Sequence, residues 1–291
     1  SAPPSGRMPN GGFYFDSIIR QPPINESALD PADNCEEFSV LTDERIRDWA
    51  DRAEALAGAT DRGVVLGLPG CGIGDIALVP GAALKRPRGI RDVEEWYVST
   101  VARKDYVKAV FDRQTEIAEE NIARLAAAVG GRAQAAFVCG TDFGTQRGLF
   151  ISVEAYRELY SPFYRRINAA IHRLTDWKTV KHSCGGVYEL IPEFIADGFD
   201  ILNPVQCSAA NMDPRKLKRE FGRDIVFWGG GVDTQKTLPF GTPDEVYDQV
   251  RERIDIFNEE GGYVFTTIHN VQANTPVENL MAMFRAVSES A

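Results

Sequence analysis

The sequence has no surplus of positive charge and no long apolar run, and each absence excludes a class of function. Its 291 residues include 32 Lys and Arg against 42 Asp and Glu, so the net charge is −10 at neutral pH. A negative field repels nucleic acid and anionic lipid, and we therefore expect neither as a main partner. A membrane-spanning helix needs about 20 consecutive apolar residues, and no stretch of the sequence reaches that length.

Cysteine is scarce, and its number argues against a disulfide framework. Five cysteines, an odd number, lie at irregular spacing in a chain of ordinary globular composition, with 44% hydrophobic and 25% charged residues. This usage indicates reduced thiols, and we expect a cytoplasmic protein. No basic start followed by an apolar stretch is present, so no secretory signal is expected. Since the first methionine is Met8, we expect the natural N-terminus to be incomplete or altered.

A regular alternation of short and long apolar patterns begins after residue 62. Apolar runs that are too short for helices alternate with longer segments whose apolar residues recur at helical spacing. This alternation is typical of βα units around a parallel sheet. The strand-like runs are 64–68, 133–139, 178–182, 201–205, 224–228 and 263–268, and the helical segments after residue 62 are 104–129, 152–174, 187–196, 214–221, 243–258 and 276–287. A further helical segment, 42–57, precedes the alternation.

The number of strand-like runs indicates a closed barrel. Six clear runs, with one or two weaker ones before residue 62, predict a (β/α)8 TIM barrel with an N-terminal arm. We place the arm at residues 1–62, with a short strand at 38–41 and a helix capped by Thr42, and the barrel at residues 63–291. A doubly wound open sheet is the alternative, but no Gly-x-Gly-x-x-Gly motif opens a helix after the first strand.

Polar residues gather where the predicted strands end. Parallel-sheet enzymes place their chemistry beyond the carboxyl ends of the strands, and in a barrel these ends meet at one mouth. Two of only three histidines, His182 and His269, stand at such ends, as do Cys184 and Cys207. The other candidate site residues at these ends are Asp142, Gln146, Asn203, Gln206 and Asp233.

The spacing of His182 and Cys184 suits a metal. In an extended segment, residues two apart point the same way, so the imidazole and the thiolate can share one ligand. Zn²⁺ takes nitrogen and sulfur donors, and a catalytic zinc needs three protein ligands and one open position. The third ligand is either His269 or Cys207. The alternative interpretation is a buried cysteine beside a hydrogen-bonded histidine.

The remaining polar candidates have both a structural and a functional interpretation. Asp142 lies in a glycine-flanked turn and either stabilises that turn or contacts a substrate. Asn203 and Gln206 either bind a substrate through hydrogen bonds or close their own loop, and Asp233 has the same two alternatives. The basic run at 85–91 is either a solvated loop or a lid that meets an acidic ligand.

An ordered series of motifs runs through the second half of the chain: GTDFGTQ at 140–146, HSCGG at 182–186, NPVQ at 203–206, MDP at 212–214, GGGVDTQ at 229–235 and TPVEN at 275–279. This series resembles the uroporphyrinogen decarboxylase superfamily. Within it, the resemblance is closer to the corrinoid-dependent methyltransferases than to the decarboxylases. It extends over roughly residues 95 to 287 and implies a (β/α)8 barrel.

The resemblance also implies a cofactor and a reaction. In the methylcobalamin:thiol methyltransferases of this superfamily, zinc is held by a His-x-Cys pair, which falls on His182 and Cys184, and by a later Cys. His269 stands at that later position. It adds no negative charge, so the metal would be a stronger Lewis acid and would activate a thiolate less. The implied protein is a zinc-dependent methyltransferase that moves a methyl group between a small methylated substrate or thiol and a corrinoid (methylcobalamin), which is carried by a partner protein or is itself a substrate.

The same resemblance assigns roles to the other candidates. Asp142 is implied as a proton donor or substrate partner, and the implied pocket residues are Gln146, Asn203, Gln206 and Asp233. A tetrapyrrole decarboxylase is the alternative function, but its polyanionic substrate requires clustered arginines, and here only Arg20 and Arg147 are candidates. A third hypothesis is a non-catalytic barrel that binds a corrinoid protein.

Overall fold

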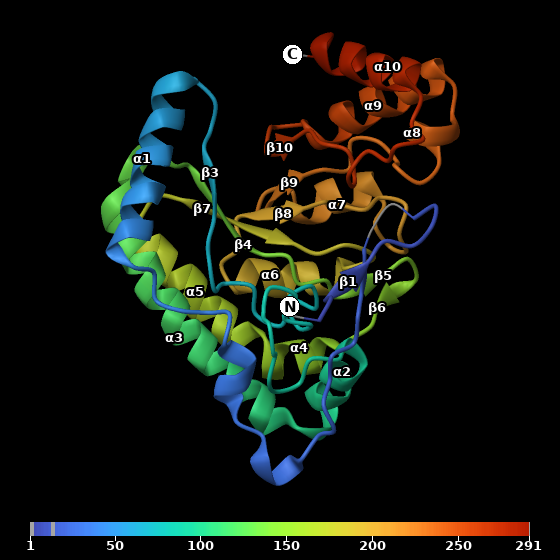
Figure 1. Cartoon of the computed structure of the whole chain (residues 1–291). Helices are drawn as coiled ribbons and strands as arrows, with labels where there is room; N and C mark the ends of the chain where they lie inside the picture. The colour runs from blue at the N-terminus through green and yellow to red at the C-terminus, as the bar shows by residue number, and fades with distance from the viewer. Residues whose placement is uncertain (1–2, 13–14, 291) are drawn as a thin grey trace. The chain divides into compact units, whose positions relative to one another are not determined.

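The computed structural model describes residues 3–12 and 15–290, and the chain forms two compact units. Unit 1 comprises Ser1–Thr141 and Glu154–Thr179, and unit 2 comprises Asp142–Val153 and Val180–Ala291. Both units combine parallel strands with helices, as Figure 1 shows. The α/β class predicted from the sequence is therefore confirmed.

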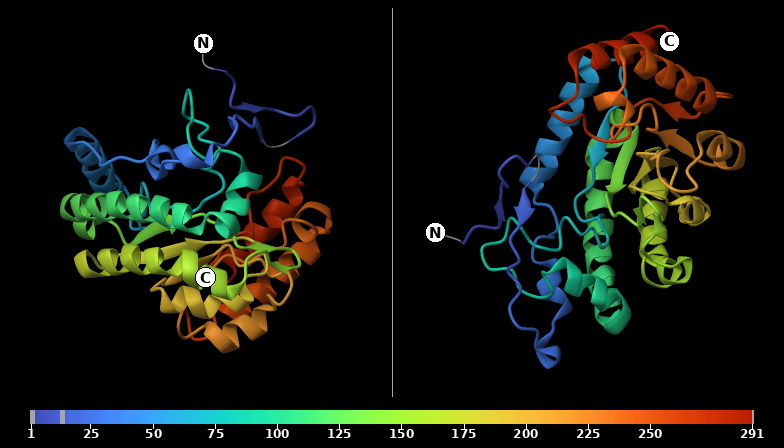
Figure 2. Two further views of the ribbon diagram at one scale, coloured as in Figure 1. Left: turned by 90° about the horizontal axis from the view of Figure 1, so that it is seen from below. Right: turned by 90° about the vertical axis from the view of Figure 1, so that its right-hand side faces the viewer.

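Unit 1 pairs two parallel strands and carries the longest helix. Strand β3 pairs with β4, with Leu66 level with Ala136. Helix α3 lies beside α5 (Figure 2), and its apolar stripe, which includes Val110 and Ile122, is buried. The described elements of unit 1 are β1 (Gly6–Arg7), β2 (Asp16–Ser17), η1 (Glu26–Ala28), η2 (Pro31–Cys35), α1 (Asp43–Ala59), β3 (Val65–Gly67), α2 (Val93–Ala102), α3 (Lys104–Val129), η3 (Gly130–Arg132), β4 (Ala135–Cys139), α4 (Val153–Leu159), whose first residue belongs to unit 2, and α5 (Ser161–Leu174).

Unit 2 contains four parallel strands in chain order, and their carboxyl ends carry the predicted site residues. Strand β7, whose first two residues belong to unit 1, pairs with β8, β8 with β9, and β9 with β10. The described elements are β5 (Gly144–Thr145), β6 (Gly148–Leu149), β7 (Lys178–His182), η4 (Tyr188–Leu190), α6 (Ile191–Ala196), β8 (Ile201–Asn203), α7 (Pro214–Phe221), β9 (Val226–Trp228), α8 (Thr237–Phe240), α9 (Pro243–Phe257), β10 (Tyr263–Val264) and α10 (Val277–Ser288).

The two C-terminal helices of unit 2 build a hydrophobic core. Val246 and Val250 of α9 pack in one cluster with Ala282 and Met283 of α10. Helix α9 begins at a complete capping box, in which the Thr242 hydroxyl accepts from the backbone of Glu245 and the Glu245 carboxylate accepts from the backbone of Thr242. Since a cap contributes about 1 kcal/mol, this local signal fixes the start of the helix that supports β9 and β10.

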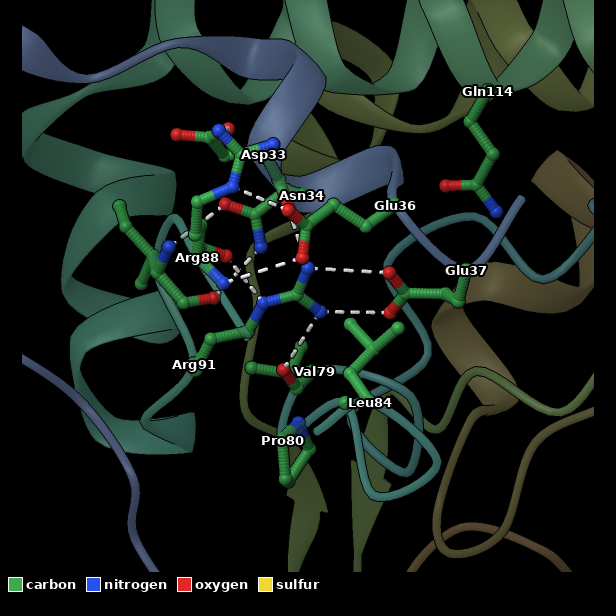
Figure 3. A network of polar contacts seen from close by, with 12 residues as sticks. Asp33, Asn34, Glu36, Glu37, Val79, Pro80, Leu84, Arg88, Arg91 and Gln114 are labelled. Carbon is green, nitrogen blue, oxygen red and sulfur yellow. Dashed lines mark hydrogen bonds and ion pairs between the residues drawn. The ribbon is translucent and has the colours of Figure 1, made fainter. Parts of the chain in front are cut away.

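A buried arginine in unit 1 ties the N-terminal segment to the loop before α2. The Arg91 side chain is fully buried, and its Nη1 and Nη2 atoms lie 2.8 and 3.2 Å from the two carboxylate oxygens of Glu37 (Figure 3). Its remaining donors reach the backbone oxygens of Asp33, Val79 and Arg88. Every donor of the guanidinium thus has an acceptor. The interpretation of the basic run as a solvated loop is wrong at this position.

Most predicted elements exist, with two corrections. Each of the six strand-like runs contains a strand, and Thr42 caps α1 by accepting from Arg45 N. The strand predicted at 38–41 is wrong, because the Asn121 side chain bonds the backbone of this segment instead of a neighbouring strand. The helix predicted at 152–174 breaks at Tyr160, between α4 and α5. Pro162, which has no N–H to donate, lies in the first turn of the second helix.

Other sequence predictions stay open. Closure of the strands into an eight-stranded barrel and the domain boundary at residue 62 stay predictions. Among the described helices, none combines the length and the apolar character that crossing a bilayer requires.

Candidate metal centre

Three potential metal ligands converge at the carboxyl end of β7 in unit 2. The Cys184 Sγ atom lies 3.4 Å from His182 Nε2, and Asp142 Oδ1 lies 4.0 Å from the same nitrogen. One ligand atom from each of the three residues lies within 4.8 Å of the others. The His182 side chain is 22% exposed and that of Asp142 is 36% exposed, so small molecules can reach the cluster. The sequence predicted two of these residues as ligands and Asp142 as the catalytic residue.

Two glycines bring Asp142 and Cys184 together. Asp142 Oδ1 accepts a 2.7 Å hydrogen bond from Cys184 N. A Cβ atom on Gly185 would lie 2.4 Å from the carbonyl carbon of Gly144, and Gly185 has a φ of +86°. Only glycine fits such a close approach with a positive φ. The loop after β7 therefore packs directly on the β5–β6 hairpin, which carries Asp142 at its base.

A side-chain amide on the neighbouring strand contacts His182 from the other side. His182 and Asn203 are register partners on β7 and β8. Their side chains meet with Nδ1 and Oδ1 2.6 Å apart. The Asn203 amide nitrogen donates to the backbone oxygen of Trp228 at 2.9 Å. Asn203 thus bonds the candidate ligand directly, and its contact with a substrate stays a prediction.

Burial favours the uncharged forms of His182 and Cys184. It lowers the pKa of His182, an effect that the Asn203 hydrogen bond and the Asp142 carboxylate partly oppose. Burial also raises the pKa of the Cys184 thiol to about 12, and Asp142 raises it further while Lys181 lowers it. A metal ion reverses this preference, because a coordinated thiol is deprotonated.

The lysine next to His182 faces away from the cluster. Lys181 is fully buried, and its Nζ lies 4.7 Å from the ring centroid of Phe143 and 5.5 Å from that of Phe194. Successive residues of a strand point to opposite faces, so Lys181 and His182 project to opposite sides of β7. The charge of Lys181 lowers the pKa values of both His182 and Cys184.

The other predicted ligands lie outside the three-residue cluster. His269 is exposed, and its charge lowers the pKa of His182. The Cys207 thiol donates to the backbone oxygen of Val205, and burial raises its pKa to about 12. The assignment of His269 as a zinc ligand stays a prediction.

The predicted pocket residues take part in loop bonds. Gln206 Oε1 accepts from Gly185 N at 2.9 Å and so fixes the loop that carries the thiol. Asp233 accepts from the backbone nitrogens of Gln235 and Lys236, as a turn-stabilising carboxylate does. The side chain of Gln146 is exposed. Their roles in substrate binding stay predictions; the pairing of Gln206 with Gly185 is a feature that sequence reasoning missed.

The donor set of the cluster fits zinc. Imidazole nitrogen, thiolate sulfur and carboxylate oxygen are the three donor types that zinc takes in proteins. A tetrahedral zinc with bonds of about 2.3 Å to sulfur and about 2.0 Å to nitrogen holds these two atoms about 3.5 Å apart. The observed Sγ–Nε2 distance of 3.4 Å agrees with that spacing.

Comparisons with known proteins identify the family and the fold of the chain. The sequence profile of the family described as Uroporphyrinogen decarboxylase (URO-D) matches residues 86–290. A methylated-thiol–coenzyme M methyltransferase of Methanosarcina mazei is 32% identical over 141 residues, which are 48% of this chain and 34% of the relative. A solved methyltransferase structure from Methanosarcina mazei superposes with a TM-score of 0.61 at 18% identity, over 95% of this chain and 72% of that one. The chain therefore shares that fold, and it spans about a third of its curated relative.

Proposed function

The chain belongs to the uroporphyrinogen decarboxylase family, and from this premise we propose that it is a zinc-dependent methyltransferase. It would move a methyl group between a small methylated substrate or thiol and a corrinoid, which a partner protein carries or which is itself a substrate. The observation that carries this proposal is the convergence of Asp142, His182 and Cys184. The name of the 32% identical relative, a methylated-thiol methyltransferase, supports the same reaction class.

The protein residues would hold the ion and leave room for the reactants. A zinc ion bound here supplies Lewis-acid chemistry at an open coordination position. His182 Nε2 and Cys184 Sγ would hold it, and Asp142 is the third donor within reach. A thiolate and a carboxylate together balance the charge of Zn²⁺, whereas the set with His269 in place of Asp142 leaves one positive charge. Asp142 is also exposed enough to contact a reactant.

The decarboxylase alternative lacks the cations it needs. Arg20 Nη1 and Nη2 donate to the backbone oxygens of Leu84 and Gly81 at 2.7 and 2.6 Å, which places this guanidinium in a structural role. A polycarboxylate substrate bound without several arginines would leave buried charges unpaired.

All five cysteines are free thiols, which supports the proposed cytoplasmic setting.

Metal analysis tests the proposal. Protein purified without chelator is expected to contain about one zinc per chain. His182→Ala and Cys184→Ala each remove a ligand, so both variants should lose the metal. His172→Ala is the matched control, because His172 is an exposed residue of α5 in unit 1 and should leave the zinc content unchanged. Wild-type protein without zinc, or full zinc content in His182→Ala, would contradict the proposal.

A pair of substitutions identifies the third ligand. Asp142→Asn keeps the shape of the side chain and an oxygen for the Cys184 N–H, but it removes the charge. Removing the hydrogen-bond partner of a metal ligand lowers metal affinity by about 10–100-fold. Because Asp142→Asn removes the charge of a direct donor, we expect it to weaken zinc binding by more than about 100-fold. His269→Gln is expected to have a smaller effect. Competition titration with a zinc chelator measures both, and the opposite order would support the ligand set predicted from the sequence.

A further inference from the structure

A line of polar contacts crosses three neighbouring strands at the edge where the candidate metal centre lies. His182 of β7 is level with Asn203 of β8. Leu202 is level with Phe227 of β9, so Asn203 is level with Trp228. Two hydrogen bonds join them, 2.6 Å from the imidazole to the amide oxygen and 2.9 Å from the amide nitrogen to the Trp228 backbone oxygen.

The hydrogen bond to the backbone oxygen of Trp228 determines the orientation of the Asn203 amide. A carbonyl oxygen has no proton to give, so the group that faces Trp228 must be the NH2 of Asn203. The amide oxygen of Asn203 then faces His182. That oxygen can only accept, and a 2.6 Å contact with Nδ1 is a hydrogen bond only when Nδ1 carries the proton.

The lone pair of the imidazole then lies on Nε2, and Nε2 faces the candidate ligands. In a neutral ring that carries its proton on Nδ1, Nε2 carries no proton. Nε2 lies 3.4 Å from Cys184 Sγ and 4.0 Å from Asp142 Oδ1. We propose that Asn203 is a positioning residue that holds His182 in the tautomer with its proton on Nδ1 and thereby prepares Nε2 to bind a metal.

The proposal deepens the proposed function and rests on it for the use of Nε2. Metal-bound histidines donate their other ring N–H to an acceptor, which fixes the orientation and the tautomer of the ring. Without the amide oxygen, the second tautomer becomes accessible, and its proton occupies the position where the metal would bind. If the role of Asn203 were merely structural, its amide would join the strands without affecting which ring nitrogen of His182 carries the proton.

Nitrogen NMR of the metal-free protein tests the tautomer directly. The chain has only three histidines, so His172→Gln and His269→Gln assign the His182 signals by removing the others. In the wild-type protein we expect Nδ1 to be protonated and Nε2 to be unprotonated. A proton on Nε2 in the wild-type protein would overturn the proposal, and this measurement requires no altered site residue.

Variants separate positioning from strand bridging. Asn203→Leu removes both hydrogen bonds and is expected to abolish the preference for the Nδ1 proton. Asn203→Asp keeps an acceptor for Nδ1 but cannot donate to Trp228, so it should keep the tautomer even if it lowers stability. Asn279→Leu is the matched control, because it removes a buried amide that donates to the backbone oxygens of Leu238 and Gly241, outside the three-residue cluster, and should leave the His182 nitrogen signals unchanged. An unchanged spectrum in Asn203→Leu would overturn the proposal.

Zinc titration of the same proteins gives the second readout. Asn203→Leu is expected to bind zinc about 10–100-fold more weakly than the wild type, and Asn203→Asp should recover most of that loss. The tautomer is read without zinc or a methyl donor. If His182 carries its proton on Nδ1 but the protein binds no zinc, only the proposed function is rejected. If the protein binds zinc and Asn203→Leu does not change the affinity, only the positioning role is rejected.

Discussion

Replacing Gly229 with alanine is expected to destabilise the protein by more than about 4 kcal/mol, which is a large effect for one methyl group. Gly229 has a φ of +134°, and a Cβ atom there would lie 1.9 Å from the backbone oxygen of Pro204 and 2.5 Å from its carbonyl carbon. The neighbouring Gly230 N donates to the same oxygen at 2.9 Å. Because these neighbours are backbone atoms of a hydrogen-bonded loop, a side-chain rotation cannot relieve the clash.

Gly261 provides the matched control. It also has a positive φ, of +82°, but no atom lies within 4 Å of the position of its Cβ. Gly261→Ala should therefore cost only the penalty of a left-handed backbone, about 1–2 kcal/mol. Urea unfolding followed by circular dichroism measures both variants. Equal stabilities would show that the contact between Gly229 and Pro204 does not constrain the fold.

The second large effect is expected at Arg91. Arg91→Met removes a fully buried cation and leaves the Glu37 carboxylate, which is 17% exposed, without its partner. Breaking a buried ion pair in this way costs about 3–5 kcal/mol, because the remaining charge stays desolvated. The carbonyl oxygens of Asp33, Val79 and Arg88 lose a donor as well. We expect a correspondingly lower midpoint of urea unfolding.

Two further variants check the cause of that loss. Arg88→Met removes a 66% exposed side chain that pairs with Asp33 and Glu36. Such a surface pair contributes less than about 1 kcal/mol, so this variant should remain close to wild-type stability. The double variant Arg91→Met, Glu37→Leu removes both charges and should recover part of the loss. A double variant that is less stable than Arg91→Met would show that packing, not the unpaired charge, dominates.

The strands could be predicted from the sequence because both of their faces are buried. Parallel strands are covered on both faces, so they are short continuous apolar runs that local sequence shows. The segment at 38–41 has a similar composition, but Asn121 of α3 provides its hydrogen-bond partners, and no local pattern reveals that contact. The basic run at 85–91 was visible as a charge cluster. Burial of Arg91 depends on Glu37, which lies 54 positions earlier in the sequence.

The candidate site was also predictable only in part, because some of its contacts join residues that are far apart in the sequence. The spacing of His182 and Cys184 predicted side chains on one face, and their ligand atoms lie 3.4 Å apart. The position of Asp142 against them depends on the contact of Gly144 with Gly185. The partnership of Asn203 with His182 depends on the strand register. Both are properties of the folded chain, because neighbouring strands can slide by one residue without changing their own sequences.

The division of the chain into units constrains how the protein can be cut or recombined. Unit 2 consists of Asp142–Val153 and Val180–Ala291, and the segment between them belongs to unit 1. A single protease cleavage between residues 154 and 179 would leave Asp142 on one fragment and His182 with Cys184 on the other. No single crossover in the gene can exchange either unit intact, so the carboxylate and the imidazole–thiol pair are inherited together only when the intervening helices are inherited too.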